Sequence, residues 1–177
     1  SAPSSIDGMV WPGYDAFLEH IGQHHPGVRV AVDLCYVGCV GSGAYRVAIT
    51  APCIDTIFFS LSKVFGVYYH RIGGVLSVDP LPGLHGNVWF KNLLSIRFGT
   101  ELMAAYGPTE LPQKYRPVQE LLVEELRSAI EPTIEPCDVL LLARAPGRVE
   151  GDRFSRSPEG RRYCLTPALD ERLAKRR

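Results

Sequence analysis

The chain has no excess of charge of either sign and no long apolar run. Its 177 residues include 19 Lys and Arg and 19 Asp and Glu, so the formal net charge is zero. A nucleic-acid-binding surface needs an excess of basic side chains, which this balance does not supply. The apolar runs end well before the roughly 18 residues that a membrane-spanning helix requires. We therefore expect a soluble globular protein that binds neither nucleic acid nor membrane.

Cysteine is scarce and odd in number, which argues against a disulfide framework. The cysteines lie apart from one another in apolar contexts, at Cys35, Cys39, Cys53, Cys137 and Cys164. We expect them to be reduced, as in a cytoplasmic protein, and to pack in the core. Cys35 and Cys39 are not followed by a second pair at zinc-site spacing, so no metal site is predicted.

One lysine stands in an otherwise apolar stretch. Lys63 lies in the run from Ile54 to Gly66, among hydroxyl-bearing residues. Burial disfavours an unpaired ammonium group, so the amine is pushed towards neutrality and becomes a nucleophile for carbonyl carbon. This is the chemistry of a lysine that forms a Schiff base. The alternative is a strand-end lysine whose ammonium group reaches water.

A carboxylate, a phenol and a guanidinium accompany this lysine along the chain. Asp33 closes a short apolar strand, and Tyr36 follows three residues later. Arg71 comes eight residues after Lys63, before two glycines, and a guanidinium can bind phosphate or carboxylate through paired hydrogen bonds. Each residue also has an ordinary role. Asp33 can serve a turn or a helix cap, Tyr36 can pack, and Arg71 can form a surface ion pair.

These residues stand in the order and spacing of a known family. The chain resembles fold-type-I pyridoxal-phosphate enzymes, and among them the class I/II aminotransferases, in the motifs Asp33-x-x-Tyr36, Ser60-Leu61-Ser62-Lys63 and Arg71-Ile72-Gly73. The resemblance implies that Lys63 forms a Schiff base with pyridoxal 5′-phosphate and moves a proton during the reaction. It implies that Asp33 holds the pyridinium nitrogen protonated and that Tyr36 donates to the ring 3-oxygen. The implied phosphate ligands are Ser60, Ser62 and Arg71.

A second arginine motif lies near the C-terminus. In the resembled family, the terminal strand carries an arginine that binds the α-carboxylate of the substrate. The segment from Gly160 to Leu165 resembles this motif, and its alternation selects Arg162, with Arg161 as the alternative. A planar guanidinium that fixes the carboxylate also orients the Cα–H bond that breaks. The ordinary reading is a surface arginine that follows a loop.

The resemblance covers the C-terminal half of the family. Residues 3–8 resemble a degenerate form of the family's Asn-Pro-x-x-Gly loop, with Ala2 in place of the asparagine. We expect a fragment, or one half of a split enzyme that pairs with a chain supplying the N-terminal half. The family also implies a homodimer. A non-catalytic partner subunit of a complete enzyme is the alternative outside catalysis.

Apolar periodicity predicts an α/β protein that becomes α+β towards its C-terminus. The expected elements of the first part are a helix from Tyr14 to His24, strands at 28–33, 44–50, 54–60 and 68–77, and a buried helix at 88–106. The expected elements of the second part are helices at 117–130 and 167–175 and strands at 138–142 and 162–165. The resemblance implies that residues 1–107 belong to the large cofactor-binding domain, with a mainly parallel sheet, and 108–177 to a small α+β domain.

The predicted function is a pyridoxal-phosphate-dependent aminotransferase, which moves an amino group from an amino acid to a 2-oxo acid. The same residues can serve a decarboxylase, a lyase or an amino-acid cyclase, because the protein selects the outcome by orienting the substrate around one cofactor. Both readings depend on Lys63 and its neighbours.

Overall fold

A computed structural model describes residues 3–41, 46–84, 86, 92–106, 110–147, 155–157 and 160–175, with only the backbone of 155–157. The chain divides into two compact units. Unit 1 comprises Ser1–Ala2, Trp11–Gly38 and Arg46–Gly107, and unit 2 comprises Pro3–Val10, Cys39–Tyr45 and Pro108–Arg177. Neither unit is one continuous block, because unit 2 takes two short segments from the N-terminal half. The assignment of 1–107 and 108–177 to a large and a small domain stays a prediction.

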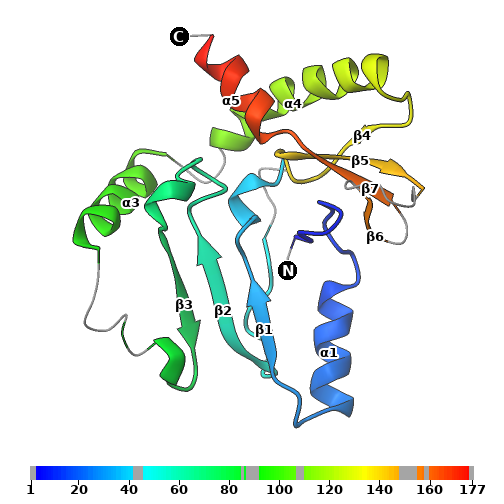
Figure 1. Cartoon of the computed structure of the whole chain (residues 1–177). Coiled ribbons are helices and arrows are strands. Elements are labelled where there is room, and N and C mark those ends of the chain that lie inside the picture. The colour runs from blue at the N-terminus through cyan, green and yellow to red at the C-terminus, as the bar shows by residue number, and fades with distance from the viewer. Residues whose placement is uncertain are drawn as a thin grey trace. The chain divides into compact units, whose positions relative to one another are not determined.

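Unit 1 is built on a three-stranded sheet in the order β1-β2-β3 (Figure 1). The strands are β1 at Val30–Asp33, β2 at Ile54–Ser60 and β3 at Gly73–Ser77. The expected parallel pairing holds for β1 and β2 and fails for β3, which is antiparallel to β2. The link between β2 and β3 contains only turns and a short 3-10 helix. Such a link returns the chain antiparallel, because a parallel crossover usually needs a helix.

The strand predicted at 68–77 begins later than expected. Tyr68–His70 forms a 3-10 helix, η2, and Arg71 after it adopts the left-handed backbone conformation with φ 52°. β3 starts at Gly73, where a Cβ atom would lie 2.5 Å from the carbonyl oxygen of Phe59. The left-handed residue ends the turn, and glycine permits the close approach of β3 to β2.

The first helix is confirmed as α1, Tyr14–His24. It packs on the sheet through a buried apolar cluster that contains Leu18, Val32, Cys53 and Ile54. The strand predicted at 44–50 is wrong over 46–50, and residues 44 and 45 lie outside the described part. The carbonyl of Ala48 accepts a hydrogen bond from the Tyr14 hydroxyl at 3.0 Å, so this segment is bonded to α1 and not to a neighbouring strand.

The helix predicted at 88–106 is α3, Leu93–Ala105, and residues 88–91 lie outside the described part. The side chain of Asn92 caps it by accepting from the Ser95 amide at 3.0 Å. The prediction that this helix is buried is wrong, because Leu93 is 74% and Leu94 80% exposed. Its buried side instead presents small residues, and a Cβ atom on Gly99 would lie 2.9 Å from Ile72.

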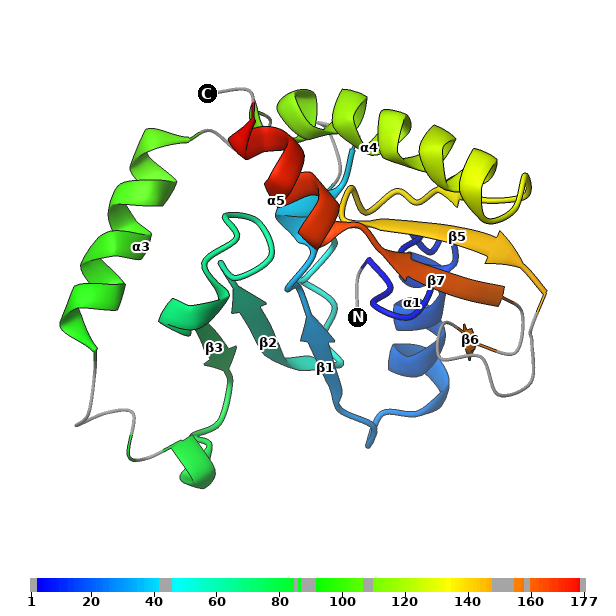
Figure 2. The same ribbon diagram turned by 45° about the horizontal axis from the view of Figure 1, so that its top comes forward.

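Unit 2 contains a four-stranded antiparallel sheet in the order β4-β5-β7-β6 (Figure 2). The strands are β4 at Glu135–Pro136, β5 at Leu142–Pro146, β6 at Ser155–Ser157 and β7 at Gly160–Cys164. Two helices, α4 at Glu110–Ala129 and α5 at Thr166–Ala174, lie on one side of this sheet. Two further 3-10 helices are η1 at Val37–Cys39 and η3 at Pro82–Leu84.

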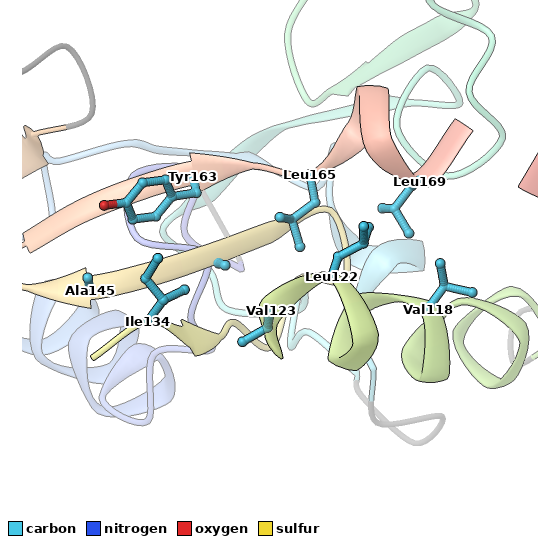
Figure 3. Packing of buried hydrophobic residues seen from close by; sticks show 9 residues of the cluster. Val118, Leu122, Val123, Ile134, Ala145, Tyr163, Leu165 and Leu169 are labelled. Carbon is cyan, nitrogen blue, oxygen red and sulfur yellow. The ribbon is translucent and has the colours of Figure 1, made fainter. Parts of the chain in front are cut away.

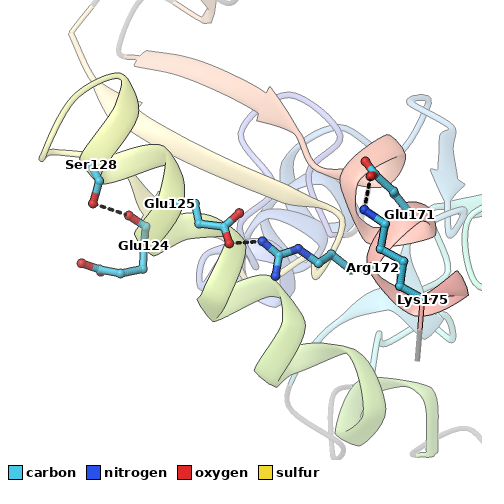
Figure 4. Close-up of polar contacts among 6 residues, drawn as sticks. All are labelled: Glu124, Glu125, Ser128, Glu171, Arg172 and Lys175. Atoms are coloured by element: carbon cyan, nitrogen blue, oxygen red, sulfur yellow. Dashed lines mark hydrogen bonds and ion pairs between the residues drawn. The ribbon is translucent and has the colours of Figure 1, made fainter. Parts of the chain in front are cut away.

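One apolar cluster holds the helices of unit 2 to the sheet (Figure 3). Its buried members are Val118, Leu122, Val123, Ile134, Ala143, Ala145, Tyr163, Leu165 and Leu169. The exposed faces of α4 and α5 carry ion pairs, Glu125 with Arg172 and Glu171 with Lys175 (Figure 4). Exposed pairs of this kind add at most about 1 kcal/mol. The apolar cluster is therefore the main source of stability in this unit.

The predicted elements of unit 2 are correct in kind and shifted in position. α4 begins at Glu110 and not near Pro117, which lies inside the helix, while Pro112 occupies the first turn. The strand predicted at 138–142 is wrong over 138–141, where the chain turns and Val139 forms only an isolated bridge to Val40, and β5 starts at Leu142. The predicted last strand and closing helix are confirmed as β7 and α5. Within the described residues, no helix combines the length and apolar character needed to cross a membrane.

Candidate functional site

Lys63 lies in the turn that follows β2. The amide of Ser62 donates to the hydroxyl of Ser60 at 3.1 Å, which shapes the first part of this turn. Lys63 itself is half-buried, so the apolar stretch expected to bury it surrounds it only in part. Its Nζ atom lies 5.7 Å from the centroid of the Tyr36 ring, within the range of a cation–π contact. The lysine and the phenol are therefore neighbours.

Asp33 ends β1 at the edge of the sheet where the Lys63 turn begins, because β1 and β2 are parallel. Its carboxylate accepts from the amide of Cys35 at 2.9 Å and so forms the turn that carries Tyr36. Burial raises the pKa of the Cys35 thiol to about 11, helped by the hydrogen bond and charge of Asp33, while the charge of Lys63 lowers it. Asp33 and Lys63 therefore lie within electrostatic reach of one thiol.

A glycine lets the two turns approach each other. A Cβ atom on Gly38 would lie 2.7 Å from Cγ2 of Val64, a distance that real side chains do not tolerate. The Tyr36 turn can thus pack directly on the Lys63 turn. Sequence reasoning did not single out Gly38, because a glycine after a tyrosine carries no pattern that indicates a contact with a residue so much later in the chain.

The predicted phosphate ligands differ in exposure. Ser62 is buried, and the half-buried Ser60 donates to the carbonyl of Ile72 at 3.4 Å. Ile72 follows Arg71, so this bond links the Lys63 turn to the arginine. Arg71 is exposed, and no ion pair formed within the described part of the chain involves it. Its guanidinium is thus available to an anion.

The two candidate carboxylate-binding arginines occupy opposite faces of the unit 2 sheet. Arg161 forms an ion pair with Glu131 at 2.5 Å, and Glu131 also accepts from the Tyr163 hydroxyl at 3.4 Å, on the side of α4 and α5. Arg162 points to the other face, where it donates to the carbonyl of Ser5. Its partner in the register of β5 is Arg144. The Arg161 guanidinium is thus already paired with a carboxylate of unit 2, whereas Arg162 contacts the segment 3–8.

A cleft of about 260 Å³ lies next to Arg162, and unit 2 alone lines it. Its charged lining residues are Asp7, Glu135, Arg144, Arg161 and Arg162. Asp7, Glu135 and Arg144 were not predicted, and no local pattern could have found them. They meet only because β5 pairs with both β4 and β7 and because residues 3–10 join unit 2. Arg144 also fell outside the strand that the sequence predicted.

The remaining cysteines bear on metal binding. All five are free thiols, and three of them, Cys39, Cys53 and Cys137, are buried as expected. Cys164 is exposed, because it ends β7 on the face away from the apolar cluster. No group of three or more His, Cys, Asp or Glu side chains is placed to hold a metal ion in the part of the chain that the structure describes.

No protein-family model matches the sequence, and no curated protein matches it. Among solved structures, the chain is similar to the aspartate aminotransferase of Thermotoga maritima, with a TM-score of 0.64 and 14% sequence identity over 98% of this chain. The chain spans 54% of that enzyme's length. The likeness shows that this chain has the mixed α/β fold of part of an aminotransferase.

Proposed function

We propose that this chain carries the cofactor-binding lysine of a pyridoxal-phosphate-dependent aminotransferase. The observation that carries the proposal is the meeting of Asp33, Tyr36 and Lys63 at one edge of the sheet, with the Lys63 Nζ atom 5.7 Å from the Tyr36 ring. These residues match the family's motifs in type and order. The likeness to an aspartate aminotransferase favours amino-group transfer over decarboxylation, elimination or cyclisation.

The residues present fit this cofactor. A carboxylate stands at a strand end, a half-buried amine lies on an aromatic ring, and an exposed guanidinium has no ion-pair partner among the described residues. Bound pyridoxal phosphate supplies an electron sink for the substrate carbon. Ser60, Ser62 and Arg71 would hold its phosphate, and Arg71 can do so with two parallel hydrogen bonds.

The side chains then have separate tasks. Asp33, whose position is fixed by the Cys35 amide, would accept a hydrogen bond from the protonated ring nitrogen and so keep that nitrogen charged. Tyr36 would donate a hydrogen bond to the ring oxygen. Lys63 would hold the cofactor through its amine and, once free, its Nζ atom would accept the proton from the substrate carbon and return it. Arg162 would bind the substrate carboxylate. It donates to the Ser5 carbonyl, whereas Arg161 is ion-paired with Glu131, and this difference supports Arg162 over Arg161.

We also propose that a further polypeptide region completes the enzyme. It can belong to a longer chain, to a second copy in a homodimer, or to a different chain in a heteromer. Exposed apolar side chains in unit 1 support this, among them Phe58, Phe59, Leu76, Leu93 and Leu94. A cytoplasmic location stays a prediction from the free thiols.

An absorption spectrum with pyridoxal phosphate tests the lysine. We expect a visible band that borohydride removes, with the cofactor mass then retained on the peptide that contains Lys63. Lys63→Ala should abolish both signals. Lys175→Ala should change neither, because Lys175 pairs with Glu171 on the exposed face of α5. If no band forms, even when co-purifying chains are present, the catalytic proposal is wrong and a non-catalytic partner subunit is the better reading.

A further inference from the structure

Three imidazole rings gather at the C-terminal end of α1, where the chain leads towards β1 (Figure 1). His20 and His24 belong to the helix, and His25 follows as its C-cap. The ring centroids of His20 and His24 lie 4.5 Å apart with planes inclined by 21°, and those of His20 and His25 lie 5.6 Å apart. All three side chains are exposed, whereas Leu18 of the same helix faces the buried cluster of unit 1. The rings are therefore open to a ligand from solvent.

Two of the rings have the spacing of a chelating pair. Side chains four residues apart share one face of a helix, and two histidines at this spacing can bind one zinc ion. With a metal–nitrogen bond of about 2.1 Å, two imidazoles on one ion have centroids about 4.5–5.5 Å apart. The separation of His20 and His24 lies in this range. Rotation of either exposed ring about χ2, a broad torsion in histidine, turns the nitrogens towards a common point.

A hydrogen bond selects the nitrogen that His24 offers. Its Nδ1 atom lies 3.2 Å from the carbonyl oxygen of His20. A carbonyl only accepts, so Nδ1 carries the proton and donates it, and the uncharged ring keeps its lone pair on Nε2. Histidine ligands of metal ions commonly donate their other ring N–H to a backbone carbonyl, which fixes the orientation of the ring. His24 is thus arranged as a ligand before any metal arrives.

The neighbouring groups do not extend the pair to a larger ligand set. The ring of His25 is tilted by 59° to that of His20 and comes from a residue outside the helix. The carboxylate of Glu19 accepts from the Gln23 amide at 3.0 Å. Over the described residues, no three His, Cys, Asp or Glu side chains are placed to hold one ion. An ion on this pair therefore completes its coordination with water or with an external donor.

We propose that His20 and His24 form a surface site for a divalent transition-metal ion such as Ni²⁺, Cu²⁺ or Zn²⁺. Imidazole suits these ions, whereas Mg²⁺ prefers oxygen ligands. The bound ion links two positions one turn apart and so holds the last turn of α1, which contains the poor helix former Gly22. The site goes beyond the proposed function and does not rest on it, because none of its residues belongs to the Lys63 site.

Calorimetric titration of the cofactor-free chain with Ni²⁺ tests the pair. Cys164→Ala serves as the parent protein, because it removes an exposed thiol that could compete for the metal. We expect one Ni²⁺ to bind with a Kd below about 0.1 mM, and His20→Gln and His24→Gln each to weaken binding at least tenfold. His70→Gln is the matched control and should bind like the parent, because His70 is exposed and packs on Phe98, not on another imidazole.

Hydrogen exchange supplies a readout of the same event in the helix. Ni²⁺ should slow the exchange of amides at 20–25 in the parent and leave it unchanged in His20→Gln. Ni²⁺ affinity that survives in both His20→Gln and His24→Gln would overturn the proposal. An equal loss of affinity in His25→Gln would replace the pair by a diffuse cluster, and comparable heat with Mg²⁺ would assign the binding to carboxylates. None of these outcomes bears on the Lys63 spectrum, so the two proposals fail separately.

Discussion

Cys137 shows how one buried side chain makes stability depend on pH. Its folded pKa of about 12 lies above the ordinary value of 9.0, mainly because of burial. The folded state therefore keeps the thiol proton after the unfolded chain has lost it. The stabilisation is complete below pH 9.0 and is lost as the pH rises from 9.0 towards 12, by up to about 1.4 kcal/mol per pH unit.

Urea unfolding of Cys137→Ala and Cys164→Ala at several alkaline pH values measures this effect. The free energy of unfolding should fall more steeply with pH in the wild type than in Cys137→Ala. Cys164→Ala, which removes an exposed thiol, should follow the wild type. Identical slopes in all three proteins would contradict the assignment to Cys137.

Arg71 combines a strained backbone with a proposed ligand role. A residue other than glycine in the left-handed conformation pays roughly 1 kcal/mol, which glycine does not. Arg71→Gly should therefore be more stable to urea than Arg71→Gln by about 1 kcal/mol. Both should bind pyridoxal phosphate at least tenfold more weakly than the wild type, because both lose the guanidinium. Equal stability of the two variants would refute the backbone strain at Arg71. Cofactor binding that survives in both would refute its role as a phosphate ligand.

At the scale of residues, the sequence predicted those features that depend on neighbouring residues in the chain. Asp33 closes a strand because an apolar run ends there, and the turns that hold Tyr36 and Lys63 follow directly. The cleft could not be predicted in this way. Asp7 and Glu135 lie far apart in the sequence, and only the fold of unit 2 brings them together. The roles assigned to the site residues stay predictions.

At the scale of elements, one glutamine ties α4 to the turn before β5. Gln119 is fully buried, and its Nε2 atom lies 2.8 Å from the carbonyl of Leu142 and 3.1 Å from those of Cys137 and Val139. Each carbonyl also accepts from Arg116 or from a backbone amide, but Gln119→Leu removes one buried donor from all three, so we expect a loss of about 1–3 kcal/mol in the free energy of unfolding.

The control for this change lies one residue away. Glu120 is exposed on the same helix, and Glu120→Leu introduces the same side chain without removing a buried donor. Its free energy of unfolding should change by about 0.5 kcal/mol or less. Equal losses in the two leucine variants would mean that the glutamine network does not hold the turn.

The same network explains why one element was misplaced. The apolar residues at 138–142 suggest a strand, but their carbonyls are bonded to a helix side chain and form a turn. β2 was predicted correctly because most of its residues are β-branched or aromatic, which favours a strand. A strand prediction from apolar pattern fails where a side chain distant in the sequence forms hydrogen bonds with the backbone carbonyls of the segment.

At the scale of the molecule, each unit draws on separate parts of the chain. Residues 3–10 and 39–41 join unit 2 through backbone bonds such as Val139 to Gly8 and Leu140 to Cys39. A sequence-based prediction that divides a chain at a single linker cannot anticipate that N-terminal segments join the C-terminal unit. The mixed α/β character was nevertheless predictable, because helical and strand periodicities alternate along the first part of the sequence.

The exposed apolar side chains of α3 lead to the last prediction. Leu93 and Leu94 open the helix and are among its most exposed residues, so the chain alone should associate at micromolar concentration in a sedimentation experiment. The double variant Leu93→Glu/Leu94→Glu should shift the protein towards monomer. It should not unfold the helix, because carboxylates in a first turn interact favourably with the helix dipole.

A charge swap on the same helix separates apolar association from simple charge effects. Arg97 and Glu101 form an exposed pair at 2.5 Å, and exchanging the two residues keeps both the net charge and the apolar surface. The swapped variant should associate like the wild type. If the wild type sediments as a monomer, or if the swap disperses it as well as the glutamates do, α3 is not an interface, and the proposal of a completing polypeptide loses the support of this surface.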